Sequence, residues 1–292
     1  MNIKQVGIVG TGQMGLGMAQ LLAQQGIKTI SVKMTGGDVS TKQTQVEKSL
    51  QRLVDREKIT EEQRSNTLSL MTITVDLHAL RNCDLVIESI VEEMDKKQEI
   101  FSQLESIVND HTILASNTST LGITELSTAV TRKERLVGLH FFNPATVMKL
   151  VEVIPTLHTQ QETVDGLVEW INSIGKTPVV VKDETGFIVN RLLTPYIIDA
   201  IRSCERGLSG VAEIDTAMKL GCNHPMGPLE LADYIGLDIV YHMSSNLYDT
   251  FKEPRLTPPP LLKTLFVAEQ IGKKSGLGFY DYSTTPPTPR SF

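Results

Sequence analysis

The feature that most constrains the fold is a glycine-rich loop near the amino terminus, Gly10-Thr11-Gly12-Gln13-Met14-Gly15. The apolar run Val6–Val9 precedes the loop, and a helix-like stretch through Met18 and Leu22 follows it. A strand, a glycine loop and a helix in this order bind the pyrophosphate of a dinucleotide, because the glycines permit a tight turn, close backbone approach and close helix packing. The phosphates then lie against the unpaired amides of the helix N-terminus. The loop therefore predicts a dinucleotide site that contains Gly10, Gly12, Gln13, Met14 and Gly15.

Up to about Lys182, short β-branched runs alternate with amphipathic stretches, which predicts a mostly parallel sheet covered by helices. The expected strands are Val6–Val9, Lys28–Val32, Leu85–Glu88, Thr112–Ala115, Leu136–Leu139, Leu150–Val153 and Pro178–Val181, and the expected helices include Thr44–Arg56 and Asp95–Val108.

From Phe187 to Tyr248, apolar residues recur at helical spacing and continuous β-branched runs disappear. We therefore expect an α/β fold with a Rossmann-type doubly wound sheet in residues 1–183 and an all-helical domain in residues 184–292. Helix breaks are expected at Gly207, Gly221, Pro225–Pro228 and Pro258–Pro260, and a loose tail after Tyr282.

Composition excludes several classes of function. The net charge of the 292 residues is −6, and the lysines and arginines are scattered, so no basic stripe favours nucleic acid. The three cysteines lie far apart without CxxC spacing, which argues against a disulfide framework or a zinc site and favours a reducing cytoplasm. No run of about 18 apolar residues and no export signal is found, so we expect no membrane insertion.

Lys33 stands at the end of the second expected strand, where an NAD-preferring site usually has an acidic residue that binds the adenosine ribose. Its ammonium group could pair with the 2′-phosphate of NADP, or it could be an exposed lysine of a loosened loop. Both readings stay open, so NAD is expected and NADP remains an alternative.

His140 closes an apolar strand, and strand ends face the ligand crevice in a doubly wound sheet. There an imidazole can exchange a hydroxyl proton while hydride is transferred. Glu152 lies on the next strand, and the two side chains could pair across neighbouring strands. The alternative is that His140 has a structural role only.

Two more polar positions have competing interpretations. Ser119 ends the run Ser116-Asn117-Thr118-Ser119 at a crevice edge, where it could bind a substrate oxygen, although capping of the following helix is the commoner role. Asn190, at the start of the helical domain, could face the crevice or be a surface residue.

Several motifs in order along nearly the whole chain resemble the L-3-hydroxyacyl-CoA dehydrogenase family, which includes bacterial 3-hydroxybutyryl-CoA dehydrogenases. These motifs are the glycine loop, Leu114–Ser119, His140–Pro144, Met148–Val153, Gly186–Arg191, Asp215–Gly221, Pro225–Pro228, Lys273–Gly276 and Gly278–Tyr280. The resemblance implies an enzyme of fatty acid metabolism that oxidises the 3-hydroxyl of an acyl thioester, or reduces the ketone, with NAD or NADP. It also implies that the helical domain completes the substrate cleft and carries a homodimer interface.

The resemblance also implies individual roles. His140 matches the general acid/base, Glu152 its orienting carboxylate, and Ser119 and Asn190 the residues that hold the reacting oxygen and the substrate. Positions that contact the nicotinamide half of the cofactor match Glu92, Lys97, Asn143 and Lys274, and positions that contact CoA match Ser49 and Arg56.

Three positions depart from the family pattern: Lys33 replaces an aspartate, Arg56 replaces a common lysine, and Gly221-Cys222-Asn223-His224-Pro225 replaces a loop of small residues and an aromatic. The last change suits a short or polar acyl group. It raises the alternative of an acyl group on a carrier protein, as in the assembly of polyketide extender units. A relative that binds the dinucleotide without turnover is a third hypothesis, and the intact set of Ser119, His140, Glu152 and Asn190 counts against it.

Overall fold

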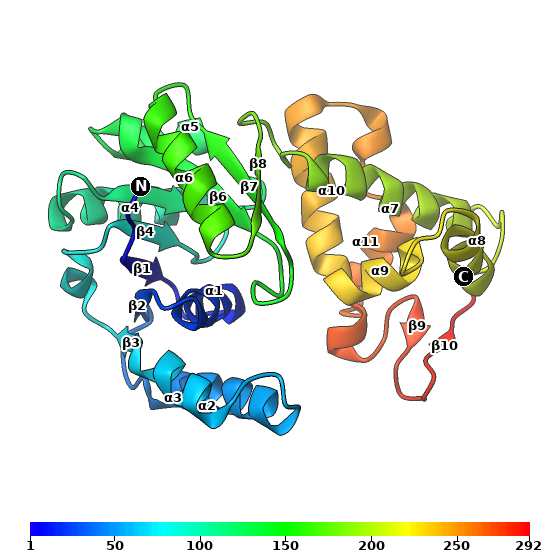
Figure 1. The fold of residues 1–292 in the computed structure, drawn as a ribbon. Helices are drawn as coiled ribbons and strands as arrows, with labels where there is room; N and C mark the ends of the chain where they lie inside the picture. Colours follow the sequence, from blue (N-terminus) through cyan, green and yellow to red (C-terminus); the bar gives the residue numbers. More distant parts are fainter. The chain divides into compact units, whose positions relative to one another are not determined.

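The computed structural model describes residues 1–292, which divide into two compact units, Met1–Glu184 and Thr185–Phe292 (Figure 1). No helix in either unit combines the length and the apolar character needed to cross a membrane.

The first unit is built on one eight-stranded sheet with the strand order β3-β2-β1-β4-β5-β6-β7-β8. All neighbouring strands are parallel except β6 and β7, which are antiparallel. The strands are β1 Gln5–Val9, β2 Lys28–Val32, β3 Met71–Thr74, β4 Leu85–Glu88, β5 Ile113–Ser116, β6 Leu136–Phe141, β7 Leu150–Pro155 and β8 Thr177–Val180. The sheet grows in opposite directions from β1 and β4, and this switch point is where doubly wound sheets bind ligands.

Helices and short 3₁₀ turns connect the strands. The helices of the first unit are α1 Gln13–Gln24, α2 Ser40–Asp55, α3 Glu61–Ser69, α4 Met94–Ile107, α5 Ile123–Leu126 and α6 Gln161–Ser173. Met18 and Leu22 of α1 and Leu167 and Trp170 of α6 share one apolar core with the strands. The helices α2 and α3, which lie below β3 in Figure 1, pack through a separate apolar cluster that includes Leu50 and Leu68.

The seven predicted strands are all present, with ends that differ by at most two residues from the predicted ones. The strand β3 is an addition, since its residues Met71–Thr74 lie at the sheet edge and lack a buried face that alternation would reveal. The helix α2 begins at Ser40, four residues earlier than predicted, where the Ser40 N–H donates to the Asp38 carboxylate over 3.0 Å.

The second unit is a helical bundle with breaks where glycine and proline predicted them. Its helices are α7 Val189–Glu205, α8 Val211–Gly221, α9 Pro228–Ile235, α10 Leu237–Phe251 and α11 Pro260–Val267. Ile197, Leu229, Val240 and Leu262, from four of these helices, share one core with Phe279.

The expectation of a loose tail after Tyr282 is wrong. The strands β9 Tyr280–Asp281 and β10 Thr288–Pro289, of two residues each, pair antiparallel within the otherwise helical unit. The Arg290 guanidinium donates to Gln270 Oε1 over 2.9 Å and to the Gly278 carbonyl over 2.6 Å. The Phe292 ring lies 5.6 Å from the Phe279 ring, so the proline-rich end is anchored by a buried aromatic and a cation.

Candidate active site

The glycine loop has the geometry that a pyrophosphate requires. Gly10 has φ +116°, and a Cβ there would overlap the Ser89 carbonyl, while a Cβ on Gly15 would overlap the Gly10 carbonyl. A Cβ on Gly12 would meet nothing within 4 Å, and Gly12 caps α1 without a side-chain hydrogen bond. Space at Gly12 and uncapped amides at a helix N-terminus fit a bound dinucleotide.

Two other loop residues have distinct environments. The Gln13 amide donates to Asn143 Oδ1 over 3.2 Å, which joins the glycine loop to the residues after β6. Met14 packs against the main core of the unit, so its side chain links the glycine loop to that core.

Lys33 has a role that neither sequence interpretation included. Its Nζ donates to the carbonyls of Gly36, over 2.5 Å, and Asp38, over 3.0 Å, and so closes the loop after β2. A cavity of about 680 Å³ beside the glycine loop is lined by Gly12, Met34, Thr35, Lys42 and Ile90 among others, and Lys33 is absent from this lining.

His140 and Glu152 lie directly opposite each other on the antiparallel strands β6 and β7. The distance from His140 Nδ1 to Glu152 Oε2 is 2.7 Å, and the residues are 6% and 1% exposed. The predicted pairing across neighbouring strands is therefore confirmed. When Nδ1 donates its hydrogen to the carboxylate, Nε2 presents a lone pair, which is the tautomer of a general base.

Ser119 lies in the loop that follows β5, and β5 is the neighbour of β6 in the sheet. The Phe141 N–H donates to Asn117 Oδ1 over 2.9 Å, so this loop is tied to the end of the strand that carries His140. The Ser119 backbone N–H and hydroxyl contact Glu92 Oε1 at 2.9 and 3.3 Å.

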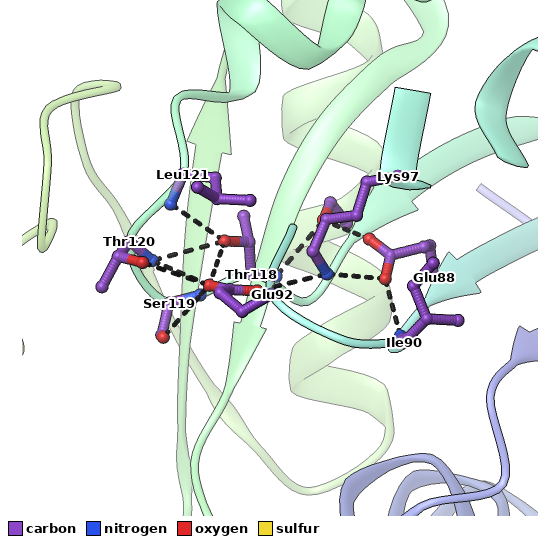
Figure 2. A network of polar contacts seen from close by, with 9 residues as sticks. Glu88, Ile90, Glu92, Lys97, Thr118, Ser119, Thr120 and Leu121 are labelled. Carbon is purple, nitrogen blue, oxygen red and sulfur yellow. Dashed lines mark hydrogen bonds and ion pairs between the residues drawn. The ribbon is translucent and has the colours of Figure 1, made fainter. Parts of the chain in front are cut away.

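Glu92 gathers donors from the whole loop, as Figure 2 shows. Its Oε1 also accepts from the hydroxyl of Thr118 over 2.5 Å and from the N–H of Thr120 over 3.3 Å. On the other side, Glu92 Oε2 lies 3.2 Å from Lys97 Nζ. Burial acts to raise the pKa of Glu92, but the Lys97 ammonium and the donors from Thr118 and Ser119 outweigh it, so the pKa is lowered and the group stays a carboxylate.

Lys97 is 1% exposed and bridges two carboxylates. Its Nζ lies 2.6 Å from Oε1 of Glu88, the last residue of β4, and 3.2 Å from Glu92 (Figure 2). The buried cation is therefore paired on both sides.

The two residues matched to CoA contacts, Ser49 on α2 and Arg56 at its C-cap, are seven positions and thus about two turns apart. The Ser49 hydroxyl donates to Gln20 Oε1 over 2.9 Å. Ser49 also lines a cavity of about 160 Å³ together with Gln13 and Asn143. Arg56 is exposed at the C-cap of α2.

Two of the expected site residues belong to the second unit. Asn190 lies in the first turn of α7, and Lys274 lies in the 3₁₀ turn Lys273–Ser275, where its Nζ donates to Asp238 over 2.6 Å. In the same unit, His224 Nδ1 lies 3.0 Å from the Tyr196 hydroxyl, and both line an apolar groove of about 570 Å³ with Leu192 and Met226.

The capping interpretation of the polar run is wrong for α5. Gly122 is the N-cap of this helix, and the carboxylate of Asp183 accepts the N–H groups of Ile123, over 2.9 Å, and Thr124, over 2.6 Å. A side chain far along the chain therefore caps this helix, and the Ser116 and Ser119 hydroxyls contact Glu88 and Glu92.

Sequence reasoning missed Glu88, Asn117 and Asp183. Glu88 carried a usable signal, since an acidic residue that closes an apolar strand needs a partner, and Lys97 follows nine positions later in the next helix. Asn117 and Asp183 act through backbone groups of distant segments, and no local pattern marks such contacts.

Both units match models of a known protein family. A family model described as "3-hydroxyacyl-CoA dehydrogenase, NAD binding domain" matches residues 5–184, and one described as "3-hydroxyacyl-CoA dehydrogenase, C-terminal domain" matches residues 186–282. The chain belongs to the 3-hydroxyacyl-CoA dehydrogenase family. Its first unit is an NAD-binding domain, and the chain is an NAD-dependent oxidoreductase of this family.

The similarity extends over almost the full length of individual relatives. A 3-hydroxybutyryl-CoA dehydrogenase of Mycobacterium tuberculosis is 42% identical over 96% of this chain and 99% of its own. The mitochondrial hydroxyacyl-coenzyme A dehydrogenase of Rattus norvegicus is 44% identical over 96% and 91%. The crystal structure of (S)-3-hydroxybutyryl-CoA dehydrogenase from Ralstonia eutropha is 41% identical and superposes with a TM-score of 0.92 over 97% of this chain and 100% of that one.

Proposed function

We propose that the protein interconverts 3-hydroxyacyl-CoA and 3-ketoacyl-CoA by hydride transfer to or from NAD. The observation that carries the proposal is the His140–Glu152 pair at 2.7 Å, on strands of an NAD-binding domain and next to the loop of Ser119. The relatives are named for 3-hydroxyacyl- and 3-hydroxybutyryl-CoA substrates, which supports the same reaction.

The roles of the residues follow from their chemistry. A dinucleotide held at the glycine loop would supply the acceptor for the hydride that leaves C3 of the hydroxyacyl group. His140 Nε2 accepts the hydroxyl proton as the carbon–oxygen double bond forms, and it returns the proton in the reverse direction. Glu152 stabilises the resulting imidazolium and keeps the ring in the productive tautomer. Ser119 holds the reacting oxygen.

The remaining contacts are assigned by family position. We assign Ser49 and Arg56 to the CoA portion, since a hydroxyl and a guanidinium two turns apart on α2 suit the phosphates of CoA. Asn190 is assigned to the substrate, and Asn143 and Lys274 to the nicotinamide half. We also assign Glu92 and Lys97 to the nicotinamide half, and these two interact directly in the structure.

NAD rather than NADP is the proposed physiological cofactor. The ammonium of Lys33 is engaged by two carbonyls of its own loop, and this geometry supports a loop-closing role over recognition of a 2′-phosphate. Free CoA is favoured over a carrier protein as the acyl carrier because the relatives are named for CoA thioesters.

Assembly and setting are inferred from the family and from the cysteines. We propose a homodimer formed through the helical domain, and a role in fatty acid metabolism, on the family resemblance. We propose a reducing compartment such as the cytoplasm, because all three cysteines are free thiols and two are buried.

The test is turnover of acetoacetyl-CoA with NADH by the purified chain. We expect His140→Ala to lose at least about 100-fold in rate, the lower range for loss of general acid/base catalysis. His158→Ala, at an exposed histidine, is the matched control and keeps the wild-type rate. Binding of dinucleotide without turnover on any acyl thioester would refute the proposed function and favour a non-catalytic relative.

A further inference from the structure

Glu88 is a fully buried carboxylate, 0% exposed, on an inner strand of the sheet. It ends β4 and pairs in register with Val9 of β1 on one side and Ser116 of β5 on the other. A buried charge without partners is strongly unfavourable, so its surroundings must supply donors.

Three donors converge on Glu88, and each comes from a different segment. Lys97 Nζ and the Ile90 N–H lie 2.6 and 2.7 Å from Oε1, and the Ser116 hydroxyl donates to Oε2 over 2.6 Å. The carboxylate is therefore fixed in position by α4, by the loop after β4 and by the end of β5.

Glu88 is the inner end of a chain of alternating charges that runs outward to Ser119. The Lys97 ammonium lies between Glu88 and Glu92, and Glu92 accepts the Ser119 N–H (Figure 2). The side chain of Glu92 is 36% exposed, whereas Glu88 and Lys97 are 0% and 1% exposed. The rigid end of the chain is thus Glu88, and the end that faces the site is Glu92.

We propose that Glu88 is a positioning residue for the reaction. It holds the Lys97 ammonium in place, and through Lys97 it orients the Glu92 carboxylate and the loop of Ser119. This inference rests on the proposed function, and it adds a residue that itself contacts neither substrate nor cofactor.

A purely structural ion pair would behave differently from a positioning residue. Exchange of a whole buried ion pair for apolar residues often changes stability little, whereas removal of one partner is felt mainly as a loss of stability. Here the cation is shared with a second, outward-facing carboxylate. Without the charge of Glu88, Lys97 is drawn toward Glu92 alone, and Glu92 and the Ser119 loop move with it.

Glu88→Gln is the primary test, because glutamine keeps the shape and the hydrogen bonds can still form. The amide oxygen accepts from Lys97 and Ile90, and the amide nitrogen donates to the Ser116 hydroxyl, whose roles reverse. We expect kcat/KM for NADH to fall between about tenfold and 100-fold, as for small misplacements of catalytic groups, while the variant still unfolds cooperatively in urea at a lowered midpoint. Glu93→Gln breaks the exposed Glu93–Lys96 pair, both 56% exposed, and is the matched control with kcat/KM within about twofold of wild type.

A double-mutant cycle with Lys97→Met shows whether Glu88 acts through Lys97. If it does, the double variant is no slower than Lys97→Met alone. An unchanged kcat/KM in Glu88→Gln, or losses that multiply in the double variant, would overturn the proposal. A wild-type chain that binds NADH, as measured by fluorescence, but turns over no acyl thioester would instead refute the proposed function.

Ser116→Ala keeps the proposal testable if Glu88→Gln does not fold. This variant leaves the Glu88–Lys97 ion pair and removes the donor to Glu88 Oε2, together with a 3.3 Å contact in which the Ser116 hydroxyl accepts the Thr118 N–H. We expect kcat/KM to fall by about threefold or more, in line with loss of one hydrogen bond to a charged group. No change in kcat/KM for Ser116→Ala would contradict the positioning role.

Discussion

Two lysines of the first unit differ in the acceptors that their ammonium groups find. Lys33 donates to two backbone carbonyls of its own loop, and Lys97 lies between two carboxylates. Both ammonium groups are engaged within the protein, but only the Lys97 interaction reaches the loop of Ser119. The position of an ammonium in the chain therefore says little about its function until its acceptors are known.

Lys33→Asp tests the basis of coenzyme preference. An aspartate after β2 accepts hydrogen bonds from the ribose hydroxyls and repels a 2′-phosphate, so we expect the ratio of kcat/KM for NADH to that for NADPH to rise at least about tenfold. Parallel assays with both coenzymes measure this ratio. Lys33→Met removes the ammonium without adding a carboxylate. If it shifts the ratio as far as Lys33→Asp does, Lys33 binds the 2′-phosphate and its proposed loop-closing role is wrong.

The sequence predicts the pairing of His140 and Glu152 because both lie on apolar strands that follow each other in the chain. It does not predict the engagement of Lys33, which depends on the path of a glycine-containing loop. For Glu88 the sequence signals only that a buried strand-end carboxylate needs a partner, and the convergence of Lys97 and Ser116 on it is seen only in the structure. Contacts within one supersecondary unit are accessible to pattern reasoning, and contacts among three segments are not.

Among the elements, the short helix α5 depends on a cap from outside its own neighbourhood. Asp183, about 60 positions away, accepts its first two N–H groups. The carboxylate also interacts favourably with the positive end of the helix dipole. The helix directly follows the Ser119 loop, so the cap fixes the far end of that loop.

Asp183→Ala removes this cap. We expect the free energy of unfolding to fall by about 1 to 2 kcal/mol, the usual cost of losing an N-cap side chain, and kcat to fall as the Ser119 loop loosens. Urea denaturation and steady-state kinetics measure the two effects. The control is Thr60→Ala, which removes the capping box of the distant helix α3 and is expected to lower stability by about 1 kcal/mol without changing kcat. Equal kcat values in the two variants would show that the α5 cap does not support the site.

Element positions follow closely from hydrophobic periodicity where a strand is buried on both faces. The strands β1, β4 and β5 are largely or fully buried, and their predicted ends are within one residue. The edge strand β3 is half-exposed and pairs on one side only, so its four residues show no clear alternation of apolar and polar side chains. The carboxy-terminal hairpin is too short for periodicity, and its stability comes from Arg290 and Phe292.

At the scale of the whole molecule, two buried aspartates join distant parts of the second unit. Asp215 accepts the Leu229 and Glu230 N–H groups and the Tyr280 hydroxyl, all within 2.8 Å. Asp233 accepts the N–H groups of Phe279 and Tyr280 over 2.9 Å each. Burial raises the pKa of both carboxyls, that of Asp233 to about 6, and hydrogen bonds only partly oppose it.

A raised pKa makes this unit lose stability as pH increases through the titration of Asp233. Between its ordinary value of 3.8 and about 6, the folded state binds more protons than the unfolded chain, so the free energy of unfolding contributed by Asp233 falls with rising pH. At about 1.4 kcal/mol per pH unit, the contribution amounts to about 3 kcal/mol.

Asp233→Asn removes this contribution. We expect the stability of the wild type minus that of the variant to fall by about 2 kcal/mol between pH 4 and pH 6.5, as measured by urea denaturation at several pH values. The variant also removes the repulsion between the Asp233 and Asp215 carboxylates, and this makes the same stability difference fall further as pH rises. Asp249→Asn, at an exposed aspartate, is the control with a nearly constant difference. A constant difference for Asp233→Asn would show that Asp233 does not titrate in this range.

The single antiparallel pair of the eight-stranded sheet, β6 with β7, determines how the proposed catalytic pair tolerates insertions and deletions. Its register places His140 opposite Glu152 through the strand ladder and not through the chain that connects them. A change of length in the connection near Val147, which is exposed, therefore leaves the two side chains opposed. Deletion of one residue within either strand turns one partner to the opposite face of the sheet.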